Sequence, residues 1–299
     1  MAPTACLLLL LFCYGSVSAR EYYGVKIGTF RNESYGLFGE VWFVNETHLQ
    51  VTNLQMSLGS ADIQPRFYFS NTEKFEKAPL VFAVKKAPHG VRYSEPTENA
   101  LPSEINKEIF VIRIPAHLKD WKYFGIVAED KWFYLSAVSL KKAYPEPLCC
   151  LSDREEPTRG IVGLFYNAGS APIVVLDSKT LLLPKFTFAG TKPPDGWIYA
   201  GVGQVDQSSG KKAFVLGRDT EAHHCAIHED YHGDTDLVVR LPEDQTVYDI
   251  TYLSVFCFQY SVDFGHIPVR LDPTRNPVPA YVPPVSHGPP RQEPFFPCP

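Results

Sequence analysis

Alternating apolar and polar positions run through most of this chain, and they predict β-strands. Short segments rich in Val, Ile, Phe and Tyr recur between Gly, Pro, Asn and Asp, residues that favour turns. No long segment shows the 3.6-residue apolar period of an amphipathic helix. The pattern therefore predicts an all-β protein of antiparallel sandwich or barrel-like domains, with only short helical turns.

The same order of strand patterns occurs twice, which predicts two diverged tandem copies of one domain. In each copy, an apolar strand, a short polar turn and a returning strand form a hairpin pattern, and a third strand is expected to follow. The corresponding segments are 24–30 and 160–165, 40–51 and 173–183, 53–56 and 185–188, 110–115 and 237–242, and 128–138 and 257–267.

The composition between and after the copies predicts the domain boundaries. The copies are assigned to residues 20–142 and 158–271, and the joint at 143–157 contains three prolines and is expected to be an exposed linker. The tail at 272–299 contains ten prolines, so we expect an extended or loosely held segment.

Residues 1–19 have the pattern of a secretory signal peptide. An apolar run at 6–14 is followed by the small residues Val17, Ser18 and Ala19, which predicts cleavage before Arg20. The alternative is an uncleaved anchor, but the run is shorter than the roughly 20 residues that span a bilayer. We therefore expect a secreted, extracellular protein without a transmembrane segment.

The net charge of −5 and the pI near 6.0 argue against a nucleic-acid-binding surface. Two sequons, beginning at Asn32 and Asn45, are open to glycosylation in an exported chain. Five cysteines follow the leader, so at least one is free, capped or in an intermolecular disulfide. These candidates for disulfide bonding, whose pairing the sequence leaves open, are Cys149, Cys150, Cys225, Cys257 and Cys298.

The second copy resembles the DM13 domain family of extracellular proteins. The resemblance rests on FTFAGTKPPDGWIY at 186–199, YHGD at 231–234 and YLSVFCFQYSVDFGH at 252–266. The first copy resembles the family less closely, through SYGLFGEV at 34–41, and it has Ala128 where the second has Cys257. The resemblance implies an extracellular or matrix protein, and a redox role for the family would fall on the second copy.

Cys257 is the main candidate for redox chemistry. Strand alternation places it on one face with Leu253 and Val255, and places Phe256 and Phe258 on the other. A cysteine at such a position is either a small core residue, half of a disulfide, or a redox-competent thiol. A reactive thiol requires a nearby positive charge, and no Lys or Arg lies within ten residues of Cys257 in the sequence.

A second cluster of candidates contains His223, His224, Cys225, His228 and His232. On a helix, His224, His228 and His232 would share a face and could hold zinc or copper with Cys225. The neighbouring Asp and Gly residues disfavour a helix, so the alternative is a polar loop that is rich in histidine. No cofactor is predicted.

Two hypotheses for the function follow. Motifs for dinucleotide binding and for a serine nucleophile are absent, and no pair of acids has a spacing that marks acid–base catalysis. The favoured hypothesis is a non-catalytic extracellular module that binds a protein or matrix partner and no nucleic acid. The alternative is a redox or electron-transfer component that uses Cys257.

Overall fold

The computed structural model describes residues 22–45, 47–59, 63–72, 82–85, 101–113, 121–128, 133–140, 145–151, 159–220, 222–242, 244–283 and 297–298. The expected leader, part of the linker and most of the far tail lie outside these residues. Apart from one short 3-10 turn, η1 (Glu33–Tyr35), the regular elements described are strands, so the all-β prediction is confirmed. Within the described residues there is no helix with the length and apolar character needed to cross a membrane.

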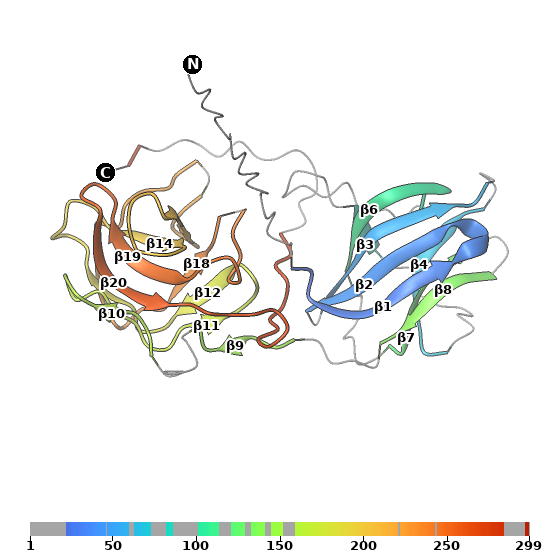
Figure 1. Ribbon diagram of the computed structural model, residues 1–299, viewed down its shortest axis with the longest axis horizontal. Helices are drawn as coiled ribbons and strands as arrows, with labels where there is room; N and C mark the ends of the chain where they lie inside the picture. Colours follow the sequence, from blue (N-terminus) through green and yellow to red (C-terminus); the bar gives the residue numbers. More distant parts are fainter. Residues whose placement is uncertain are drawn as a thin grey trace, which may run out of the picture.

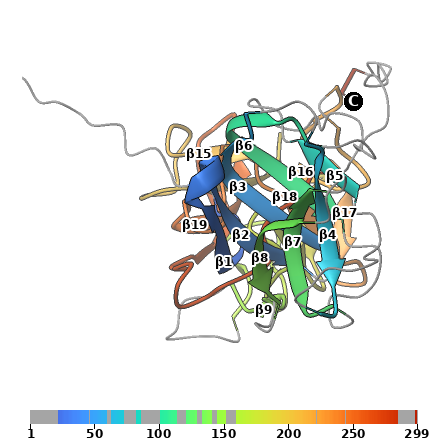
Figure 2. The ribbon, with the colours of Figure 1, turned by 90° about the vertical axis from the view of Figure 1, so that its right-hand side faces the viewer.

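The first half of the chain forms two antiparallel sheets, on the right of Figure 1 and facing the viewer in Figure 2. One sheet has the strand order β1-β2-β3-β6-β5, and the other has the order β4-β7-β8. Their bounds are β1 (Val25–Asn32), β2 (Leu37–Asn45), β3 (His48–Ser57), β4 (Pro65–Ser70), β5 (Phe82–Lys85), β6 (Glu104–Arg113), β7 (Tyr123–Ala128) and β8 (Phe133–Ser139).

The second half, on the left of Figure 1, also forms two larger antiparallel sheets. A further pair of strands forms a separate two-stranded sheet. The order is β16-β18-β12-β11-β9 in one sheet and β10-β20-β19-β14-β15 in the other, and β13 pairs with β17. The bounds are β9 (Leu148–Cys149), β10 (Val162–Gly163), β11 (Val174–Val175), β12 (Thr180–Leu183), β13 (Thr187–Ala189), β14 (Trp197–Gly201), β15 (Gly210–Lys212), β16 (Phe214–Val215), β17 (Asp230–His232), β18 (Leu237–Arg240), β19 (Tyr252–Cys257) and β20 (Val262–Pro268).

Corresponding strands pair in the same register in both halves. Strand β3 pairs with β6 in the same register as β12 with β18. Strand β4 likewise pairs with β7 in the same register as β14 with β19. The hairpins β7–β8 and β19–β20 also share a register shift at the same place. Three residue pairs of the first half thus match three of the second. They are His48↔Arg113 with Thr180↔Arg240, Phe67↔Ile126 with Ile198↔Val255, and Ile126↔Ser136 with Val255↔Gly265.

The expected third strand at 53–56 is not a separate element. Strand β3 runs without interruption from His48 to Ser57, and its pairing with β6 shifts between Val51 and Leu54. Asn53 lies there with a left-handed φ of 52°. An irregularity of this kind bends a strand and admits an extra residue without ending it, which the sequence pattern did not distinguish from a turn.

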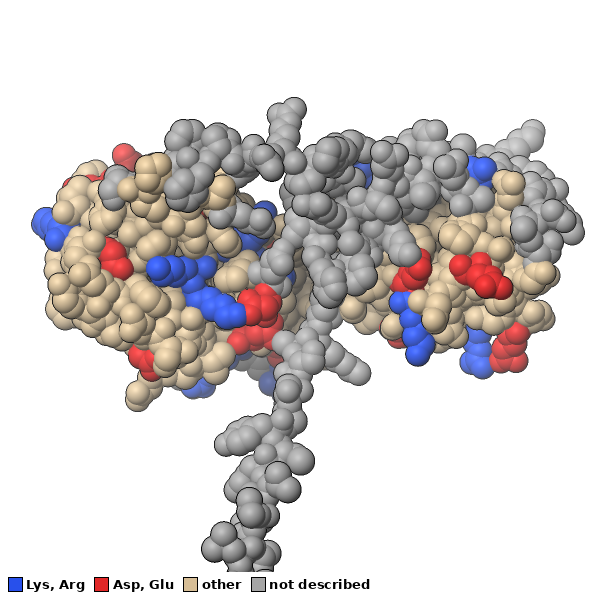
Figure 3. Space-filling model, turned by 90° about the horizontal axis from the view of Figure 1, so that it is seen from above, with Lys and Arg blue, Asp and Glu red and all other residues tan. Residues whose placement is uncertain are grey.

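The core of the first half is rich in aromatic side chains. Phe30, Phe67, Phe69 and Phe124 are buried between its strands, and the ring of Phe124 contacts the other three. In the second half, branched aliphatic residues from both large sheets and from the segments between their strands make up most of the core. On the face shown in Figure 3, Lys and Arg are interspersed with Asp and Glu, and no broad field of one charge covers either half.

Part of the proline-rich tail is packed against the second half, so the expectation of a loosely held tail is wrong for residues 276–283. Val278 and Ala280 are buried, and the backbone N–H of Ser178 donates to the carbonyl of Pro279 over 2.8 Å. The Tyr248 hydroxyl donates to the Asn276 carbonyl over the same distance. Such an extended segment binds because its apolar side chains complete the core, although proline itself offers no N–H.

Because His48 is largely buried, we expect the folded protein to lose stability in acid. Burial, with a smaller contribution from Arg113 on the paired strand β6, lowers the pKa of His48 to about 4. Between that value and the unfolded pKa of about 6.5, the unfolded state binds more protons, so stability should rise with pH across this window. Urea midpoints measured from pH 4 to 7 should show this slope, and His48→Gln should flatten it. An unchanged slope in the variant would contradict the assignment.

A buried thiol and its carboxylate partner

Cys257 ends strand β19, and its side chain is 1% exposed. It lies in the main core of the second half with Leu253 and Val255, as the alternation predicts. Phe256 points to the opposite face, where it stacks on Tyr199 with ring centroids 4.7 Å apart. Among the described cysteines, Cys257 is the one that forms no disulfide.

The thiol of Cys257 has a specific partner, the carboxylate of Asp195. The S–H group donates to Asp195 Oδ1 over 2.7 Å. The other oxygen, Oδ2, accepts from Trp197 Nε1 at 2.9 Å and from the backbone N–H groups of Phe258 and Gln259, each at 3.2 Å. Asp195 therefore joins the turn before β14 to the end of β19.

A cation covers this group, although none is near Cys257 in the sequence. Lys212, on strand β15, places Nζ 3.5 Å from the ring centroid of Trp197 and 4.4 Å from that of Phe258. Burial lowers the pKa of Lys212, and the charge of Asp195 acts in the opposite direction. Strand pairing brings Lys212 to this place, since β15 joins β19 through β14.

Burial raises the pKa of Cys257, and the hydrogen bond to Asp195 raises it further because that bond requires the proton. Nucleophilic sulfur is the thiolate, so this environment keeps Cys257 in its less reactive form at neutral pH. The site holds a thiol that is buried, protonated and hydrogen-bonded to a carboxylate.

The first half lacks this group at the equivalent positions. Strand β4 pairs with β7 as β14 pairs with β19, which places Arg66 where the second half has Trp197. By the same register, Gln64 corresponds to Asp195 and Ala128 to Cys257. The thiol, its acceptor and the indole are thus all replaced in the first half.

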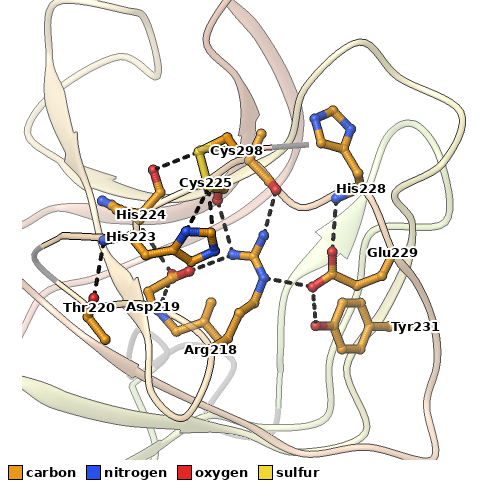
Figure 4. Close-up of polar contacts among 12 residues, drawn as sticks. Arg218, Asp219, Thr220, His223, His224, Cys225, His228, Glu229, Tyr231 and Cys298 are labelled. Carbon is orange, nitrogen blue, oxygen red and sulfur yellow. Dashed lines mark hydrogen bonds and ion pairs between the residues drawn. A yellow bond between two sulfur atoms is a disulfide. The ribbon is translucent and has the colours of Figure 1, made fainter. Parts of the chain in front are cut away.

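The histidine-rich segment forms a loop, shown in Figure 4. Cys225 is bonded to Cys298, so its sulfur is not available as a thiolate ligand, and the His223 ring lies against that sulfur at 3.7 Å. Among the residues that the structure describes, no group of three or more His, Cys, Asp or Glu is placed to hold a metal ion. His232 lies on strand β17, whereas His224 and His228 belong to the loop.

Arg218 organises this loop through its guanidinium group (Figure 4). It binds the buried carboxylate of Asp219 at 2.8 Å and the carboxylate of Glu229 at 2.7 Å, and it donates to the carbonyl of Cys225 at 3.0 Å. His224 packs between Phe214 and Trp197, and burial lowers its pKa. The loop is therefore held by charge-assisted hydrogen bonds and by the disulfide to the tail.

The structure also describes Cys149, Cys150 and the asparagines of the two sequons. Cys149 and Cys150 form a disulfide with each other at the end of β9. The expectation of an exposed linker is wrong here, because β9 pairs with β11 and Leu151 is buried in the core of the second half. Asn45 lies at the β2–β3 turn, where its Oδ1 accepts from the backbone N–H of Thr47 at 2.9 Å. Asn32 instead caps η1 and donates from Nδ2 to the Leu135 carbonyl at 3.0 Å.

Residues 166–269 match the family model described as "Electron transfer DM13". These residues form a DM13 domain. The matched region contains Asp195, Trp197, Lys212 and Cys257, so the thiol and its partners all belong to the DM13 domain.

Two curated Drosophila melanogaster proteins are also similar to this chain. Protein Skeletor, isoforms B/C, is 27% identical over 267 residues, which cover 87% of this chain and 31% of that protein. Isoforms D/E of Protein Skeletor show the same identity over the same length, with 16% of that protein covered. The chain thus spans less than a third of either relative. No solved structure matches it.

Proposed function

We propose that this chain is a secreted protein of two DM13-type domains that serves as a non-catalytic extracellular binding or matrix-associated module. The observation that carries the proposal is the state of Cys257, a buried thiol that a carboxylate keeps protonated. A thiol in that state contributes to the core and is a poor nucleophile. The two disulfides fit an oxidising compartment, as the signal-peptide pattern does.

The first domain is proposed to be a diverged DM13 domain at 20–142, joined through 143–157 to the domain at 158–271. Within that joint, β9 already pairs with β11 of the second half. Support comes from the shared registers of three strand pairings and the shared register shift. Because a one-residue slip turns every side chain to the other face, a common register in two diverged halves favours a common ancestor.

Export should leave a defined product. Mature protein is expected to begin at Arg20 and to carry glycan on Asn45, whose side chain lies in an exposed turn, on Asn32, or on both. Amino-terminal sequencing of secreted protein and digestion with an N-glycosidase measure this, with Asn45→Gln and Asn32→Gln assigning the sites. An intact Met1 terminus and no mass shift would contradict the proposal.

The reactivity of Cys257 tests the non-catalytic assignment. Iodoacetamide at neutral pH should fail to label Cys257 in the folded protein and should label it in urea, since burial and Asp195 suppress the thiolate. Peptide mapping by mass spectrometry locates the label, and Cys257→Ala gives the background. Rapid labelling of the folded protein would contradict the assignment and favour a nucleophilic role.

Electron transfer is the second candidate function. It is favoured by the description of the matched family and by the contact between the Cys257 thiol and a carboxylate that can take its proton. Resistance to alkylation does not separate the two candidates, because electron transfer needs no thiolate and no contact with a bulky reagent. Oxidation by a one-electron reagent does separate them.

A further inference from the structure

An electron can leave a buried thiol easily only if a proton leaves with it. Removal of the electron alone would create a positive sulfur centre within the core, where an unbalanced charge is strongly disfavoured. Prior loss of the proton is also disfavoured, since burial and Asp195 both oppose the thiolate. The favourable route moves the proton to a nearby base as the electron departs.

We propose that Asp195 is the proton acceptor for Cys257, so that one-electron oxidation of this thiol is coupled to transfer of its proton to Asp195 Oδ1. The inference rests on the electron-transfer candidate and specifies its mechanism. The S–H bond breaks and an O–H bond forms on Asp195. The electron passes to a one-electron oxidant, such as a ferric or cupric centre of a partner, and Cys257 becomes a neutral thiyl radical. Re-reduction returns the electron and draws the proton back.

The geometry suits this step. Sγ and Oδ1 are 2.7 Å apart, so the proton moves along an existing hydrogen bond and no group has to rearrange. The second oxygen is fixed by the Trp197 indole and two backbone N–H groups. These three donors hold the carboxylate in place, and the Gln259 N–H also lies 3.4 Å from Oδ1, which accepts the shorter hydrogen bond from the thiol.

Comparison with the first half shows that this strand pairing does not require the group. Ala128, Gln64 and Arg66 stand at the places of Cys257, Asp195 and Trp197, and the strands around them pair in the same register. The same strand pairing thus forms without the thiol or the carboxylate. What the second half adds at this place is a proton donor beside a proton acceptor.

The pH dependence of oxidation tests the proposal in the full secreted chain. Ferricyanide serves as the one-electron oxidant, its reduction is followed by absorbance, and spin trapping with peptide mapping locates the radical on Cys257. With Asp195 as internal acceptor, the rate should be nearly independent of pH between 6 and 8. In Asp195→Asn the rate should be lower at pH 6, on the order of 10²-fold, and should rise about tenfold per pH unit through the thiolate route.

Controls separate the possible failures. Cys257→Ala gives the background, and Asp244→Asn, which removes an exposed carboxylate paired with Lys211, should behave as wild type. A wild-type rate that rises about tenfold per pH unit would overturn the role of Asp195 and leave electron transfer intact. A wild-type rate equal to that of Cys257→Ala would overturn both. If Asp195→Asn fails to fold, as judged by circular dichroism, the wild-type pH profile alone decides.

Discussion

Phe124→Ala is expected to lower the free energy of unfolding of the first half by about 3–5 kcal/mol. Phe124 is fully buried on β7, and its ring centroid lies 4.9 Å from that of Phe69, 5.4 Å from Phe67 and 5.6 Å from Phe30. The cost is large because four rings meet there, and truncation leaves a cavity that the surrounding strands cannot close.

The matched variant is Leu253→Ala, since Leu253 occupies the equivalent position on β19 and is also fully buried. Denaturant unfolding followed by circular dichroism, with calorimetry, measures both variants. If the halves are separate domains, each variant should shift one of two transitions. An equal shift of a single transition by both variants would contradict independent domains, and a loss below about 1 kcal/mol for Phe124→Ala would contradict its place in the core.

Arg218→Met is expected to destabilise the second half by about 3–5 kcal/mol. The Asp219 carboxylate is almost completely buried, and the guanidinium is its partner at 2.8 Å. Removal of Arg218 leaves that charge without its cation and frees the carbonyl of Cys225 and the carboxylate of Glu229. Methionine keeps much of the side-chain volume, so the loss reports the charge and its hydrogen bonds.

Two controls accompany this measurement. Arg218→Lys keeps the charge but loses the fork that binds several acceptors, so an intermediate loss of stability is expected. Lys211→Met removes an exposed ion pair with Asp244 and should cost less than about 1 kcal/mol. Similar small losses in Arg218→Met and Lys211→Met would show that the loop does not depend on the Arg218 network. Urea unfolding with the disulfides intact gives all three values.

The strand patterns of the sequence predicted the all-β fold and the face of β19 on which Cys257 lies. Alternation has a period of two in any strand, so local sequence is enough to place Leu253, Val255 and Cys257 together. The same local information failed at Asn53, where a strand bends without ending. It also failed in the tail, whose prolines predicted a loose segment, because a partner surface formed by Ser178 and Tyr248 decides whether it binds.

The chemistry of the thiol was decided by tertiary structure. Asp195 lies 62 positions before Cys257 and Lys212 lies on another strand, and only the pairing of β14 with β15 and β19 brings them together. Disulfide pairing was equally open, since Cys225 and Cys298 are separated by 73 positions. A sequence determines which residues can carry a charge or a proton. Their pKa values depend on burial and on partners across strands, and these exist only once the sheets have formed.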